Sequence, residues 1–450
     1  MSPPDPVKLG MTWFGIFRLG LVQACLGAIV VLTTSTLNRV MVVELGLAAM
    51  VPGALVALHY AVQMARPRMG FGSDVGRRRT PWIAGGMAVL AAGGAGAALA
   101  TSWMGTYPKA GMALAAFCFF LVGLGVSACG TSLLVLLATQ VQEDRRAAAA
   151  TAVWVMMIVG FAVTAGLAGH FLDPYTPRRL VMVSAIVSSL AFVLAMGALV
   201  GLEQPGERAA PAEGRPAFRK ALAQVWEEPD ARRFTIFVFV SMLAYSAQDL
   251  ILEPFAGIRF GFTPGESTQL SGVQHAGTLA GMLLASLAGR RVMGVSLGSL
   301  RAWITWGCLA SALAISGLVL GAATAGHWPL RANVFLLGVA NGAFSIAAIG
   351  SMMALANQGR SAREGTRMGL WGAAQAIGFA VGGVLGTAAS DVARALLGSQ
   401  VAAYGTVFAG EAVLFVVSAV LAARMAVPAL MQTAAAPGRL EDAHEQVAHL

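Results

Sequence analysis

Charged and amide side chains inside long apolar stretches are the residues of this sequence with the clearest chemical potential. They form two groups, Asn38, Arg39 and Glu44 in the first, and Gln248, Asp249 and Glu253 in the second. A charge in hydrocarbon is costly unless it is paired or hydrated, so these residues are candidates for binding and Glu44, Asp249 and Glu253 for carrying protons. An offset of 209 residues places Glu44 on Glu253. The alternative is an outer-interface position, where snorkelling or ordinary solvation removes the cost.

Two histidines, His59 and His275, also fall inside apolar stretches. A neutral imidazole can ligate the magnesium of a chlorin, relay a proton, or hydrogen-bond a neighbouring helix. Glutamines in similar places are Gln63, Gln274 and Gln375, which can join the same polar site or hold helices together. The residue types leave these uses open.

Other kinds of site are not indicated by the sequence. It shows no nucleophile elbow, phosphate-binding loop or zinc-ligand spacing, so we expect no catalytic residues, no metal site and no enzyme. The four cysteines stand singly in apolar stretches without a CxxC pair, which argues against a disulfide framework.

The elements that must position these residues are apolar segments of membrane-spanning length. The chain is 57% hydrophobic and only 11% charged, whereas soluble domains carry about 25% charged residues. A helical crossing needs about 20 apolar residues, and only helices or closed barrels satisfy the backbone in lipid. The sequence therefore predicts an all-α integral membrane protein with twelve transmembrane helices. They lie near residues 20–40, 46–65, 82–102, 112–138, 151–171, 180–202, 234–254, 267–289, 302–322, 332–356, 368–390 and 402–426.

The basic residues between the stretches orient the chain. With both termini cytoplasmic, 23 of the 30 Lys and Arg lie in inner segments, which favours an N-in/C-in topology. Because the bases sit in loops, the net charge of +9 indicates topology and not a nucleic-acid partner. We expect a first six-helix half at 1–202, a cytoplasmic central loop at 203–233, a second half at 234–426 and a disordered cytoplasmic tail at 427–450.

The two halves share a pattern at an offset of 218 residues. GFAV begins at Gly160 and again at Gly378, and the same shift carries Asp173 onto Asp391. Both copies show small residues at every fourth position, which lets helix backbones approach closely in lipid. These positions are Gly160, Thr164 and Ala168, and Gly378, Gly382 and Gly386. Duplication predicts two six-helix halves of the same topology.

The loop after the second stretch reads GFGSDVGRRRTPW. It resembles the major facilitator loop signature Gly-x-x-x-Asp-Arg-x-Gly-Arg-Arg, with matches at Gly70, Asp74, Gly76, Arg77 and Arg78. It departs by one residue of spacing, and Val75 replaces the expected Arg. Glycine permits a tight turn, and an aspartate beside arginines and helix ends can hold neighbouring helices in one conformation. The loop is therefore a candidate conformational latch; the alternative is a plain positive-inside loop.

Four longer segments resemble one branch of the major facilitators, the PucC/LhaA family of bacteriochlorophyll-delivery proteins. The resemblance covers nearly the whole chain apart from the tails and the central loop. The segments are GAIVVLTTSTLNRVMVVEL (27–45), ALHYAVQMARPRMGFGSDVGRRRTPWI (57–83), AQDLILEPF (247–255) and GLWGAAQAIGFAVGGVLGT (369–387).

This resemblance implies a light-harvesting assembly factor that supplies bacteriochlorophyll to antenna polypeptides. The implied partners are those polypeptides, bacteriochlorophyll synthase and membrane lipid. The implied location is the bacterial cytoplasmic membrane, including the intracytoplasmic photosynthetic membrane. Some members are labelled as a chain of bacteriochlorophyll synthase, but nothing here resembles the Asp-rich diphosphate sites of prenyl-transferring synthases. A proton-coupled exporter of an apolar small molecule is the alternative, and an enzyme subunit ranks below both.

Overall fold

The computed structural model describes residues 11–65, 78–203, 226–288, 299–324, 327–358 and 364–425, and within these ranges it contains no β-strand. The first helical rod is continuous but irregular. It consists of α1 (Trp13–Val31), the π-helical η1 (Leu32–Thr36), α2 (Leu37–Arg39) and the π-helical η2 (Val40–Glu44). The next helices are α3 (Met50–Val62), the short η3 (Gln63–Ala65), α5 (Thr80–Met104), α6 (Pro108–Gln140), α7 (Glu143–Leu172) and α8 (Pro177–Leu199). The remaining helices are α10 (Pro229–Phe260), α11 (Pro264–Ala288), α12 (Leu300–Ala323), α13 (Leu330–Gln358), α14 (Glu364–Leu397) and α15 (Gln400–Ala423).

Local sequence explains many of the helix ends. Proline stands in the first turn of α5, α6, α8 and α10, where its missing N–H costs nothing. The Thr176 hydroxyl caps α8 by accepting from the Arg179 N–H at 3.1 Å. Gly261 ends α10 with a φ of +71°, a left-handed conformation that glycine adopts without strain.

Ten helical segments of the described ranges are long and apolar enough to cross a membrane. They are the composite first rod and every later helix except α3 and α11. The 13-residue α3 is short, and α11 is long but contains Glu266, Gln269, Gln274 and His275. The predicted all-α, multi-pass membrane fold is confirmed. The count of twelve crossings and the N-in/C-in orientation stay predictions.

The outer surface of the bundle is apolar. Large side chains such as Phe14, Leu167, Leu313 and Leu396 are exposed. In water such a surface would drive association, whereas in lipid it matches the hydrocarbon.

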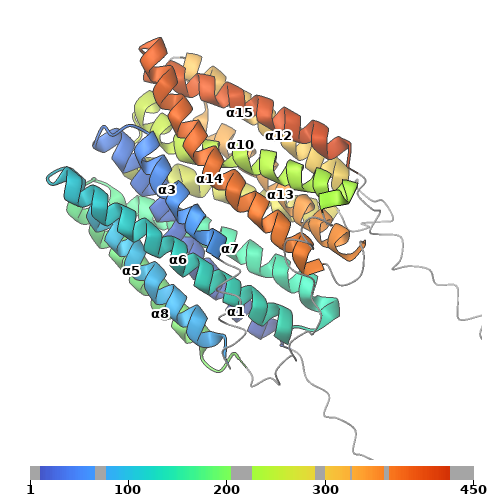
Figure 1. The fold of residues 1–450 in the computed structure, drawn as a ribbon. Coiled ribbons are helices and arrows are strands. Elements are labelled where there is room, and N and C mark those ends of the chain that lie inside the picture. Colours follow the sequence, from blue (N-terminus) through green and yellow to red (C-terminus); the bar gives the residue numbers. More distant parts are fainter. Residues whose placement is uncertain are drawn as a thin grey trace, which may run out of the picture.

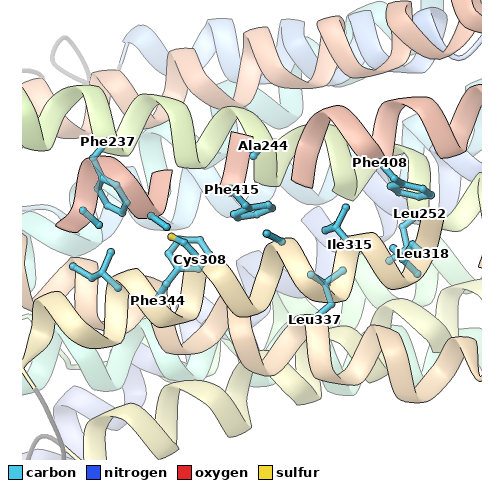
Figure 2. Packing of buried hydrophobic residues seen from close by; sticks show 14 of the residues in the cluster. Phe237, Ala244, Leu252, Cys308, Ile315, Leu318, Leu337, Phe344, Phe408 and Phe415 are labelled. Carbon is cyan, nitrogen blue, oxygen red and sulfur yellow. The ribbon is translucent and has the colours of Figure 1, made fainter. Parts of the chain in front are cut away.

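Buried apolar clusters fill the interior. In the cluster of Figure 2, Phe237, Phe344, Phe408 and Phe415 come from α10, α13 and α15 and interdigitate with aliphatic side chains such as Ile315 of α12. Two further clusters fill the space among helices earlier in the chain. Because lipid tails are as apolar as these side chains, the gain on folding in the membrane comes from close packing.

Two groups of helices lie side by side, the first group α1–α8 and the second group α10–α15 (Figure 1). They meet along two helix pairs, which we name the first seam (α7 with α11) and the second seam (α3 with α14). The predicted small-residue contacts are confirmed within each group. A Cβ on Gly160 would lie 2.4 Å from the Ala24 carbonyl oxygen of α1, and one on Gly382 would lie 2.3 Å from the Leu243 carbonyl oxygen of α10.

Candidate functional site between the helix groups

The polar site begins at a distortion of the first rod. The hydroxyls of Thr33 and Thr34 donate to the carbonyls of Ile29 and Val30 at 2.7 and 3.0 Å. Such bonds compete with the regular helix ladder, and the rod becomes π-helical at Leu32–Thr36. A π-turn redirects side chains and is frequent at functional sites. Here it presents hydroxyls to the second group.

Those hydroxyls meet α10 and α11. Ser35 donates to the carboxylate of Glu253, and the Ser35 and Ser271 hydroxyls lie 3.3 Å apart. The hydroxyls of Thr36 and Thr268 lie 3.0 Å apart. All five side chains are buried, and the second oxygen of Glu253 has no hydrogen-bond partner among the described residues. A buried carboxyl group therefore lies beside two separate hydroxyl contacts that join the two groups, Ser35 with Ser271 and Thr36 with Thr268.

One of these contacts follows from a proline. Pro254 lies inside α10 and has no N–H, so the carbonyl of Leu250 loses its helical donor. The amide of Asn38, from the other helix group, donates to that carbonyl at 2.5 Å. The proline that weakens α10 thus creates the acceptor that attaches it to the first rod.

Arg39 makes a second attachment next to it. Its guanidinium pairs with Glu44 and donates to the Phe262 carbonyl at 2.6 Å. Arg39 is only 2% exposed and Glu44 is 32% exposed. A Cβ on Gly257 would lie 2.9 Å from the Arg39 guanidinium, so the absence of a side chain there makes room for it. Arg39 is therefore a buried, paired cation and does not snorkel to solvent, whereas Glu44 lies nearer the surface.

The second predicted group divides in two. Gln248 is buried, and its side-chain oxygen accepts from Asn341 at 3.4 Å, while Asn341 accepts from Ser311 at 2.8 Å. This network joins α10, α12 and α13 within one group. Asp249 is part-buried and makes no hydrogen bond or ion pair within the described ranges. Only Glu253 of this set hydrogen-bonds to the first rod.

The two candidate histidines are held differently. The Nδ1–H of His275 donates to the Ser271 carbonyl at 2.8 Å, because a carbonyl oxygen can only accept. This fixes the tautomer and leaves Nε2 as the basic nitrogen, with no partner among the described residues. The His59 Nε2 instead accepts from the Gln63 amide at 2.9 Å. Ligating histidines are commonly oriented by such a second-nitrogen bond, so the geometry favours His275 over His59 as a ligand.

The predicted glutamines do not converge on one point. Gln63 contacts His59. The Gln274 side chain is buried, with its amide nitrogen unpartnered among the described residues. The Gln375 amide lies 3.8 Å from the Met242 sulfur inside the second group. Gln63 therefore supports a histidine, whereas Gln375 serves packing between α14 and α10.

Aromatic rings occupy equivalent places on the two seams. On the first seam, Phe161 packs edge-on against His275 with ring centroids 4.9 Å apart. On the second, Phe379, the GFAV counterpart of Phe161, stacks on Tyr60 at 5.0 Å. Tyr60 also packs against the ring of His59 at 4.8 Å. Each histidine therefore lies in or beside an aromatic contact between the groups.

The predicted latch falls largely outside the described ranges: Gly70, Asp74, Gly76 and Arg77 lie there, and Arg78 is exposed. Just beyond them, the Glu203 carboxylate accepts from the backbone N–H groups of Arg79 and Thr80 at 2.7 and 2.8 Å and from the Thr80 hydroxyl at 2.7 Å. Partial burial raises the pKa of Glu203, but these hydrogen bonds outweigh it and hold the pKa below its usual value. Glu203 thus caps the first turn of α5.

No group of three His, Cys, Asp or Glu side chains in the described ranges could hold a metal ion. An open groove of about 350 Å³ lies between α5 and α6, and its lining, which includes Trp82 and Gly85, is almost wholly apolar. These helices carry neither histidine.

Comparison with known proteins identifies the family. The family model described as PUCC protein matches residues 36–430. A Rhodobacter capsulatus protein named "Bacteriochlorophyll synthase 44.5 kDa chain" is 52% identical over 413 residues, covering 91% of this chain and 95% of that protein. Protein PucC of Rhodobacter capsulatus is 30% identical over 428 residues, 90% of each chain. The chain belongs to the PucC family.

Solved structures agree on the fold of this PucC-family chain. The nucleoside transporter NupG superimposes with a TM-score of 0.65 at 16% identity, over 91% of this chain and 98% of that chain. A bacterial homologue of the human lysosomal transporter Spinster, inward-facing and unoccupied, gives 0.64 at 15% identity, over 92% and 97%. At such identity the likeness shows the fold alone, which confirms the major facilitator type of bundle.

Several polar residues of this PucC-family chain escaped the sequence interpretation. Ser35 and Ser271 were not singled out, because single hydroxyls are common in membrane helices and bond to their own backbone. Glu411 of α15 was also missed; it is 2% exposed and both carboxyl oxygens lack a partner among the described residues. The rule that selected Glu253, an acid inside an apolar stretch, would have found Glu411 too.

Proposed function

We propose that this chain is a light-harvesting assembly factor that binds bacteriochlorophyll within the membrane and delivers it to antenna polypeptides. Membership of the PucC family supports the proposal, as does the name of the 52% identical relative, which links that protein to bacteriochlorophyll. The observation in this chain that carries it is the held imidazole of His275, with Nδ1 bound and Nε2 available at the seam between the helix groups.

The chemistry of His275 suits a magnesium-centred pigment. Nε2 would bind the central magnesium, and the Ser271 carbonyl would orient the ring by holding Nδ1–H. Phe161 packs beside it with ring centroids 4.9 Å apart and makes its surroundings more apolar. Apolar contact, at about 25 cal/mol per Å² buried, would supply most of the affinity, and the imidazole would set the orientation.

Delivery in this proposal requires no catalysis. The chain would take pigment from the bacteriochlorophyll synthase and release it to antenna helices docked alongside, without moving it across the bilayer. Such an exchange belongs in the cytoplasmic membrane and its intracytoplasmic photosynthetic extensions. If the isolated chain attaches the isoprenoid tail to the pigment precursor, the non-enzymatic proposal is wrong.

A proton-coupled exporter of an apolar small molecule is the second candidate. The buried carboxyl of Glu253, bonded to Ser35 across the two groups, favours it. An acid in that position can take up or release a proton as the groups move apart. In proteoliposomes an exporter would move substrate along an imposed pH gradient, and Glu253→Gln would abolish that coupling.

Purification tests the main proposal. The protein is isolated in mild detergent from a phototrophic host and, as the control, from a strain that makes no bacteriochlorophyll. We expect a bacteriochlorophyll band in the first absorption spectrum, which reappears in the control after pigment is added, together with antenna polypeptides among the co-purified proteins. A colourless protein that takes up no added pigment would reject the carrier proposal and favour the exporter.

The match of Gly70, Asp74, Gly76, Arg77 and Arg78 to the major facilitator signature supports a separate proposal, that Asp74 acts as a latch through Arg77 or Arg78. A charge-assisted hydrogen bond of about 1.5–3 kcal/mol would shift a two-state equilibrium tenfold or more. Asp74→Ala should therefore impair antenna assembly while the protein stays in the membrane. Normal assembly in this variant would identify a plain positive-inside loop.

A further inference from the structure

Two aspartates 218 residues apart occupy equivalent places at one end of the bundle. Asp173 directly follows α7 of the first group, and its carboxylate reaches the start of α11 in the second group. It accepts from the Thr263 hydroxyl at 2.6 Å and from the Gly265 N–H at 3.2 Å. A Cβ on Gly265 would lie 2.3 Å from this carboxylate, so the first turn of α11 accommodates it only because residue 265 has no side chain.

Asp391 repeats the arrangement in the opposite direction. It lies near the end of α14 in the second group and accepts from the N–H groups of Ala49 and Met50 at 3.1 and 2.8 Å. These N–H groups begin α3 of the first group. Free N–H groups and the positive end of the helix dipole favour a carboxylate at such a position. Each helix group therefore caps a helix of the other.

The end of the bundle where α3 and α11 begin, here named the clasped end, holds a third attachment between the groups. Arg39 of the first rod donates to the Phe262 carbonyl, just beyond α10. At the opposite end, two polar contacts each join helices of one group. Glu203 caps α5 from the end of α8, and Glu228 forms a two-point ion pair with Arg367 of α14 at 2.9 and 3.0 Å.

We propose that Asp173 and Asp391 form a paired gate that holds the clasped end shut, so that ligands enter between the groups from the opposite end or from the lipid. The two caps are related by the internal duplication, so separating the groups at this end breaks both together. The gate would set the route by which the cargo enters. That the cargo is bacteriochlorophyll rests on the proposed function, whereas the gate itself does not.

Distance measurements between spin labels test the gate in the full-length protein without pigment. The background replaces the four buried native cysteines with alanine. One label pair across the groups is Phe171→Cys with Leu336→Cys, and a second is Met50→Cys with Val392→Cys; all four native side chains are exposed. A third pair, Leu336→Cys with Val392→Cys, lies within the second group and reports whether that group stays intact.

Alanine at each aspartate removes both cap hydrogen bonds, whereas asparagine keeps one accepting oxygen and loses the other, because its NH2 group can only donate. We expect Asp173→Ala or Asp391→Ala to raise the open-to-closed ratio roughly tenfold, and the double alanine variant to lengthen both cross-group distances. The within-group distance should not change, and the asparagine variants, which keep one of the two accepting oxygens, should fall between the wild type and the alanine variants. Asp230→Ala, an exposed acid at the other end of α10, is the matched control. A double alanine variant with wild-type cross-group distances would overturn the gate.

A second measurement covers the case in which the double variant fails to fold. A short bifunctional maleimide joins Met50→Cys to Val392→Cys and locks the second seam at the clasped end. The locked protein should bind added bacteriochlorophyll as well as the unlinked protein does. Loss of binding on linking would overturn the route, whereas absence of binding before linking would reject the proposed function and leave the distance result intact.

Discussion

The two seams between the helix groups share the same capping and ring contacts but differ in the polar side chains that they hold. Both are closed at one end by an aspartate from the opposite group, and both place the phenylalanine of a GFAV sequence against an aromatic ring. On the first seam, the basic nitrogen of His275 has no partner among the described residues, and Ser271 of α11 contacts Ser35, the donor to Glu253. On the second, the corresponding nitrogen of His59 is occupied by Gln63.

This difference separates contacts that both copies of the duplicated half retain from polar side chains that differ between the copies. Caps, close approaches and ring contacts hold the two groups together, so both copies retain them. The Nε2 of His275 and the second oxygen of Glu253 do not stabilise the bundle, since a buried polar atom without a partner is costly. Of the two seams, only the first has a histidine whose basic nitrogen lacks a partner among the described residues, and its α11 contacts Ser35, the donor to Glu253; this points to function at the first seam.

The largest expected effect is a loss of stability when a methyl group is added where two helices approach closely at a seam, and it should differ between the two seams. A Cβ on Gly169 would lie 2.6 Å from the Gly265 carbonyl oxygen, and backbone cannot move aside easily. We expect Gly169→Ala to destabilise by about 3 kcal/mol, measured by thermal unfolding in detergent. A Cβ on Gly53 would meet the Thr387 side chain at 2.2 Å, so Thr387→Ala should rescue Gly53→Ala.

Gly166 is the matched control on the same helix, because a Cβ there would meet nothing within 4 Å. Gly166→Ala should be neutral or slightly stabilising. Equal losses for Gly166→Ala and Gly169→Ala would show that the first seam is not closely packed.

A smaller loss of stability should distinguish Glu44 from Glu253, the two acids that the 209-residue offset aligns. Glu44→Gln leaves the buried Arg39 without its anion and should cost about 2 kcal/mol, below the range for fully buried pairs because Glu44 is 32% exposed. Glu253→Gln keeps an oxygen that can accept from Ser35 and should cost less. Thermal unfolding of both variants in the same detergent makes the comparison. A larger loss for Glu253→Gln would mean that its carboxylate is ionised and structurally required.

The smallest effect concerns Glu203, whose cap stays within one group. Its folded pKa is lowered, so its stabilisation is present above the unfolded pKa, near 4.3, and is lost as pH falls through the folded pKa. Glu203→Ala should cost about 1 kcal/mol at neutral pH, and the difference from the wild type should vanish in acid. Unfolding at several pH values measures this, and cross-group label distances should not change. A pH-independent difference would mean that the carboxylate charge contributes nothing.

Much of the helical bundle could be predicted from the sequence. The apolar lengths predicted the helices, the spaced glycines predicted close contacts, and the 218-residue offset paired Asp173 with Asp391 before any contact between helices was known. These features are local or periodic, and a single chain displays them directly. The offset could not show that each aspartate caps a helix of the other group, because that depends on how the groups dock.

The polar site was less predictable. Residue type alone gave His59 and His275 equal standing, and only the partner of each ring nitrogen separates them. The acceptor of Asn38 is created by Pro254, more than 200 residues away, and no sequence pattern connects the two. Contacts of this kind depend on side-chain directions across packed helices, which periodicity does not specify.

One measurement tests the asymmetry of the seams most directly: bacteriochlorophyll content and absorption spectrum of His275→Leu and His59→Leu, purified side by side from a pigment-producing host. We predict that His275→Leu loses pigment or shifts its long-wavelength band, while His59→Leu, which removes a histidine already bonded to Gln63, keeps the wild-type content and spectrum. Both proteins should remain folded, as judged by thermal unfolding. Wild-type pigment binding by His275→Leu, or equal losses in the two variants, would contradict the assignment of function to the first seam.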